Sequence, residues 1–146
     1  MAKDDYVVIP PVLNVTIEDS MDIMIARDTA RRAAALLGFA PAFRAQLAGA
    51  AGALAELVLK TGTMHEIEFN GVQHGGKTGI QISCQALWLV NVSAGNVEMA
   101  LRAKLGDLVD DIEMFGEAPP TIFLTMWLLA PREMKSFDST EPNAMP

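Results

Sequence analysis

Several features that would each indicate a class of protein are scarce or missing in this sequence. The only cysteine is Cys84, which excludes a disulfide framework and fits a reducing compartment. Eleven Lys and Arg residues against 18 Asp and Glu residues give a formal net charge of −7. This balance argues against a nucleic-acid partner, which would need a basic surface. No apolar run reaches the ~18 residues of a membrane span, and the first residues lack a secretory signal. We therefore expect a cytoplasmic protein that binds neither nucleic acid nor a membrane.

The length and composition predict one folded domain. With 146 residues, 51% of them hydrophobic and 20% charged, the chain can bury a core without a metal or a disulfide. Residues 131–146 are polar, flanked by prolines and aperiodic, which is typical of a mobile terminus. We expect a single domain over residues 1–130 and a flexible C-terminal tail over residues 131–146.

The hydrophobic pattern predicts an α+β fold. Two β-prone runs, 6–9 and 12–15, are separated by Pro10-Pro11, a pair that suits an edge strand or a bulge. Apolar residues at helical spacing predict helices over 21–37, 41–62 and 97–109. Further strands are expected over 65–72, 80–89, 112–115 and 121–129, the last of them central because it is apolar on both faces. We expect a two-layer sandwich in which a mixed, mostly antiparallel sheet is covered on one face by about three helices.

A short signature in the first helix suggests a family. It consists of the pair Ala26-Arg27, a further Arg31, and then Leu37-Gly38-Phe39, followed by a second helix and a strand. This arrangement resembles the start of the bacterial anti-sigma factors and switch serine kinases, small members of the GHKL (histidine-kinase-like) ATPase fold. The resemblance implies a protein serine kinase scaffold that uses ATP and Mg²⁺. It also implies partners such as a sigma factor, a STAS-type antagonist or a phosphatase module.

The second helix departs from this family. There the family has a Glu-Leu-x-x-Asn box whose Asn holds the magnesium ion on the nucleotide phosphates. Aligned without a gap, the Glu falls on Ala53 and the Asn on Leu57; shifted by one turn, they fall on Glu56 and Lys60. Leucine cannot coordinate a metal and lysine would repel one. Glu56 and Lys60 are therefore relic positions of a nucleotide site, or simply an i,i+4 surface ion pair.

The next family motif is missing as well. Where the family has a strand that ends in Asp-x-Gly-x-Gly, Gln85 takes the place of the Asp that accepts from adenine. Leu87 and Leu89 take the glycine places with Trp88 between them, so bulky side chains are expected to fill an adenine pocket. The family's phosphate lid of roughly twenty residues is reduced to about ten and offers only Gly95.

These departures predict a catalytically inactive regulatory protein that acts by binding another protein, with no catalytic residues, cofactor or metal. One alternative is an active ATP-dependent serine kinase of the same family. The other is a small-ligand-binding or assembly module on the same sandwich.

One side of the second helix consists of small residues. Glycine in a helix interior costs about 1 kcal/mol relative to alanine, so something should offset Gly49 and Gly52. Close approach of another helix would do so, either from within the domain or from another chain. We take the second reading as the prediction, with a homodimer as one form of it, and expect a partner interface at Ala48, Gly49, Gly52 and Ala55.

The remaining motifs give weaker evidence for a function. His65 and His74 have no further ligand at metal-binding spacing, and Cys84 sits in an apolar alternation typical of a core residue. The Gly-Lys-Thr at 76–78 lacks the upstream glycine of a phosphate-binding loop and precedes a strand where that loop would precede a helix.

Overall fold

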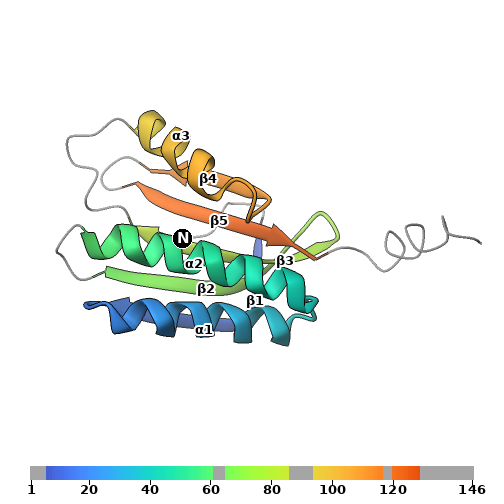
Figure 1. The fold of residues 1–146 in the computed structure, drawn as a ribbon. Coiled ribbons are helices and arrows are strands. Elements are labelled where there is room, and N and C mark those ends of the chain that lie inside the picture. Colours follow the sequence, from blue (N-terminus) through green and yellow to red (C-terminus); the bar gives the residue numbers. More distant parts are fainter. Residues whose placement is uncertain (1–5, 61–64, 86–93, 117–119, 129–146) are drawn as a thin grey trace, which may run out of the picture.

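The computed structural model describes residues 6–60, 65–85, 94–116 and 120–128. Over these ranges the elements follow the expected order, except that one strand takes the place of the first two (Figure 1). They are β1 (Val7–Ile17), α1 (Met21–Leu36), α2 (Pro41–Lys60), β2 (His65–His74), β3 (Lys77–Gln85), α3 (Ala94–Leu105), β4 (Asp111–Phe115) and β5 (Thr121–Trp127). The proposed tail, residues 131–146, lies outside these ranges.

The strands form one five-stranded sheet in the order β1-β2-β3-β5-β4, and every neighbouring pair is antiparallel. The expected central place of β5 is confirmed, because it lies between β3 and β4. The α+β sandwich is confirmed, whereas the expectation of a mixed sheet is wrong for the described strands. A short turn joins β2 to β3, and a tight connection of this kind pairs strands antiparallel.

Strand β1 runs through the proline pair that was expected to separate two strands. The register with β2 shifts between Ile9 and Val12, so Pro10 and Pro11 form a bulge in one edge strand. Proline has no backbone N–H that could donate a hydrogen bond to a neighbouring strand. This explains why the pair lies at a bulge on the edge of the sheet.

The β2–β3 connection is tighter than the glycine-rich segment suggested. His74 pairs with Lys77, and only Gly75 and Gly76 lie between the strands, with φ of +57° and +82°. Two residues with positive φ give the hairpin turn whose twist matches the flanking strands. Strand β3 therefore begins at Lys77, three residues before the expected start, and the Gly-Lys-Thr sequence belongs to a hairpin.

Helix α3 also differs from expectation. It was predicted over 97–109, but it occupies Ala94–Leu105. The Gly106 N–H donates to the Arg102 carbonyl at 2.9 Å, and the following residues lead directly into β4. The apolar residues Leu108 and Val109 suggested a longer helix. They lie after the end of α3, where Val109 is part of the core and Leu108 packs against it.

The three helices share one face of the sheet with a single apolar core (Figure 1). The sheet contributes large side chains, with Phe69, Ile82, Leu124 and Ile112 in one cross-strand row. Helix α1 contributes mainly alanines. Helix α2 is buried on several sides, although Phe43 in its first turn is exposed. By length and composition alone α2 could span a membrane, a test that the core helix of a soluble protein also passes.

Gly79 in β3 is expected to tolerate no side chain. A Cβ there would lie 2.6 Å from the Met126 carbonyl oxygen and 2.7 Å from a ring carbon of Trp127, so Gly79→Ala should lower the free energy of unfolding by about 1–3 kcal/mol. The control is Gly49→Ala in α2, whose Cβ would meet only Leu108 Cδ1 at 3.5 Å. That change should stabilise the protein by up to about 1 kcal/mol through helix propensity. Urea unfolding measures both, and equal stability of Gly79→Ala and the unmodified protein would contradict the packing described.

His65 should make stability depend on pH. It is 5% exposed at the start of β2, and burial lowers its pKa. Below about pH 6.5 the unfolded chain therefore takes up a proton that the folded chain resists. The free energy of unfolding should fall as the pH drops below that value, and level off below the lowered pKa of the folded state. His65→Gln should flatten this part of the curve in urea unfolding, whereas parallel curves for the two proteins would refute the assignment.

Candidate functional site

The two charged residues of α2 that the sequence suggested as relics of a nucleotide site lie on the surface. Glu56 and Lys60 are exposed, one turn apart near the C-terminal end of the helix. Within the described ranges neither side chain makes a hydrogen bond or an ion pair, so the surface ion pair considered from the sequence is not formed. Leu57, the other position that matches the family's Asn, is half-buried and packs against the core. An oxygen ligand for a metal is therefore missing at both alternative positions of the motif.

Gln85 is the last residue of β3 and is exposed. Its neighbour across the sheet is Thr121, and its carbonyl accepts a bond from the Cys84 thiol at 3.4 Å. The C-terminal ends of β3 and α2 both lie on the left side of Figure 1. Leu87, Trp88 and Leu89 fall in 86–93, outside the described residues, so the filled adenine pocket stays a prediction.

The small residues of α2 are covered from within the chain. Ala48 and Ala55 are 1% and 0% exposed, and Gly52 is buried beneath the Arg27 side chain of α1. Gly49 is half-buried and faces Leu108. The prediction of a partner interface at Ala48, Gly49, Gly52 and Ala55 is therefore wrong. These residues are small because α1 on one flank, and the segment after α3 on the other, approach the helix closely.

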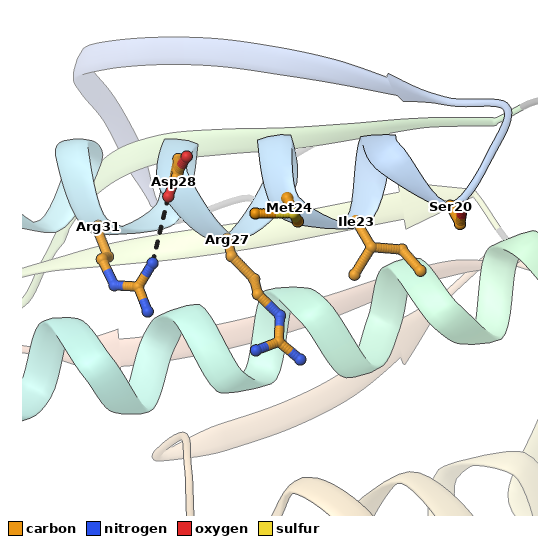
Figure 2. Close-up of a pocket in the computed structure, with 6 residues that line it drawn as sticks. All are labelled: Ser20, Ile23, Met24, Arg27, Asp28 and Arg31. Carbon is orange, nitrogen blue, oxygen red and sulfur yellow. Dashed lines mark hydrogen bonds and ion pairs between the residues drawn. The ribbon is translucent and has the colours of Figure 1, made fainter.

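A groove of about 340 Å³ lies along the side of α1 that faces α2 (Figure 2). The residues lining it come from α1 and its N-cap: Ser20, Ile23, Met24, Arg27, Asp28 and Arg31. Helical periodicity explains the set, since positions three or four apart share one side of a helix. The groove combines apolar and charged side chains along about three turns.

Arg27 is the distinctive residue of this groove. Figure 2 shows its side chain extending from α1 across α2. A Cβ at Gly52 would collide with Arg27 Nε and lie 2.9 Å from Cζ, so glycine makes the space that the guanidinium occupies. Among the residues that the structure describes, none accepts a hydrogen bond from Arg27 or pairs with its charge. An exposed guanidinium with its five N–H donors is therefore available to a partner.

The neighbouring charges in the groove are paired with each other. Arg31 Nη1 lies 3.3 Å from Asp28 Oδ1, and both side chains are mostly exposed. Such a surface pair contributes little to stability, so a stronger acceptor can displace it. Met24 lies beside the pair and is exposed, which adds an adaptable apolar contact.

Sequence reasoning used Ala26-Arg27 and Arg31 as a family signature and missed the groove. The available signal was the helical stripe of Met24, Arg27 and Arg31, which is consistent with one exposed side of α1. Nothing in the sequence indicated that Arg27 lies over Gly52, because this contact joins residues of two different helices.

The remaining chemically notable residues have structural roles. Cys84 is buried, and desolvation raises the pKa of its thiol to about 12, so it is protonated at neutral pH and its assignment to the core is confirmed. On the other face of the sheet Gln81 Nε2 donates to Thr125 Oγ1 at 3.3 Å, and Trp127 Nε1 donates to Asp111 Oδ2 at 2.9 Å. These bonds join neighbouring strands. Within the described ranges, no three His, Cys, Asp or Glu side chains are grouped so that they could hold a metal ion.

Comparison with models of known protein families and with curated proteins gave no match for this chain.

Proposed function

We propose that this chain is a catalytically inactive relative of the anti-sigma factors and switch serine kinases, and that it regulates by binding another protein through the groove on α1. The order strand, helix, helix, strand, strand over β1 to β3 supports this, because it is the order that the resemblance implies. The GHKL assignment is part of the same proposal.

The proposed loss of kinase chemistry rests on side-chain chemistry at three positions. Mg²⁺ prefers oxygen ligands, but the candidates for the family's Asn are Leu57, which packs against the core, and Lys60, which is positively charged. Gln85 carries an amide where the family has a carboxylate. An amide is neutral, so it is a weaker acceptor for the adenine amino group.

The binding proposal rests on the exposed guanidinium of Arg27, which has no partner among the residues that the structure describes. The two residues of the Ala26-Arg27 signature have different surroundings, since Ala26 is fully buried in the core and Arg27 lines the groove. Arginine and methionine are enriched in protein interfaces, where a guanidinium pairs with a carboxylate and methionine adapts to an apolar side chain. A protein partner that offers an acidic residue beside an apolar one fits this groove. The resemblance suggests a sigma factor, a STAS-type antagonist or a phosphatase module.

The chain should not respond to nucleotide. Thermal melts with and without Mg-ATP should coincide, because a ligand present at a hundredfold excess over its Kd would add about 2.7 kcal/mol of apparent stability. Mg²⁺ alone serves as the control. A clear rise in melting temperature that requires both ATP and Mg²⁺ would favour the active kinase instead.

Replacement of Arg27 should remove partner binding. We expect the tagged full-length chain to capture a partner of one of the three classes from its own cells, and Arg27→Ala to lose it while a thermal melt shows that the variant is still folded. Arg32→Ala is the matched control, since Arg32 is an exposed arginine of the same helix that does not line the groove. Equal capture of such a partner by Arg27→Ala and Arg32→Ala would refute the role of the groove.

A further inference from the structure

Two large side chains are buried on the face of the sheet away from the three helices, which we call the open face (Figure 1). Successive residues of a strand point to opposite faces, so Gln81 and Phe123 lie opposite to the core residue Ile82. Both are only 2% exposed. Their partners across the β3–β5 pair are Thr125 and Ser83, which are too short to cover them. Their burial therefore requires a cover that none of the described helices supplies.

A buried hydrogen-bond acceptor on the open face lacks a donor. Asn70 of β2 pairs with Gln81 of β3, and its side-chain oxygen Oδ1 is buried. The Gln81 amide donates to Thr125 Oγ1 at 3.3 Å, and no described residue donates to Asn70 Oδ1. Buried acceptors are rarely left unpaired, because burial removes their hydrogen bonds to water. The cover of the open face is therefore expected to bring an N–H group, as an extended backbone does.

The first described residue, Tyr6, lies on the open face. Its ring centroid is 4.6 Å from that of His74 and 5.7 Å from that of Trp127. Trp127 pairs with Gly79, and its ring lies over that glycine, where a Cβ would be 2.7 Å from a ring carbon. Tyr6 is thus held by aromatic contacts at one end of the β3–β5 pair, and the residues that precede it start from there.

We infer that residues 1–5 form an arm that lies across the open face over the β3–β5 pair, and that a backbone N–H of this arm donates to Asn70 Oδ1. Five extended residues span at most about 17 Å. Phe123 is four residues from Trp127 along β5, which is about 13 Å. An arm that starts beside Trp127 at Tyr6 is therefore long enough to cover the buried side chains.

The other segments outside the described ranges fit the open face less well. Leu128 packs against the core, so the chain beyond it starts from the helix side of the sheet. Residues 86–93 and 117–119 connect elements at the opposite end of β3 and β5. A loop there would have to reach about 13 Å to Gln81 and then return to the next element.

The test is the labelling rate of a cysteine placed on the open face of the full-length chain. Thr125→Cys changes the volume little at a side chain that is 1% exposed. The native Cys84 adds no background, because burial raises the pKa of its thiol to about 12. A thiol reagent should modify Thr125→Cys slowly in the full-length chain. Deletion of residues 2–5 should raise this rate about tenfold or more, because the cover is lost.

Thr121→Cys is the matched control, since it lies on the same face of β5 but six residues, or about 20 Å, from Trp127. Its labelling rate should not respond to the deletion. Tyr6→Ala in the full-length chain should also speed the labelling of Thr125→Cys, because it removes the aromatic contacts that hold the arm. Thermal melts show whether each variant is folded.

Rapid labelling of Thr125→Cys in the full-length chain would overturn the inference, because the open face would then be uncovered. An unchanged slow rate in the folded chain without residues 2–5 would also overturn it and assign the cover to another segment. If the deletion prevents folding, the rate in Tyr6→Ala decides in the same way. The outcome does not depend on the proposed function, because none of these residues lines the groove on α1.

Discussion

The close contact between α1 and α2 is the constraint on which the rest of the structure depends. Alanines of α1 such as Ala26 and Ala30 are buried in the same core as Ala51 and Ala55 of α2, and Gly52 lies beneath Arg27. Small side chains let two helices approach closely. Helix α1 contributes little apolar volume of its own, so large side chains of the sheet and of α2 fill the space around it. The helix-propensity cost of glycine in α2 is offset by this packing.

The same contact gives α1 two different exposed sides. On the side towards α2, Gly52 leaves space for the Arg27 guanidinium, and the groove presents charge beside Met24. On the other side, Met21 and Ile25 are exposed together with Arg32. The first side has the mixed chemistry of a transient protein interface.

The proposed loss of nucleotide chemistry concerns residues outside the set that lines the groove. Glu56, Lys60 and Gln85 lie near the C-terminal ends of α2 and β3, at the same end of the helix pair as the first turns of α1. Sequence comparison within the resemblance located these positions, and the structure adds that Leu57 packs against the core. The proposed binding and the proposed loss of catalysis are assigned to different residues, so single substitutions can test each of them.

The sequence by itself determined the central position of β5 and the order of the elements from α1 onward, because these follow from the period of apolar residues along a single segment. It could not determine which helix covers Gly52, or that Arg27 is exposed in a groove, because both depend on residues that are distant in the chain. The glycines and alanines of α2 signalled close packing but not its partner. Only the tertiary structure decided that the partner is α1, since a small-residue surface fits a neighbouring helix of its own domain as well as one from another chain.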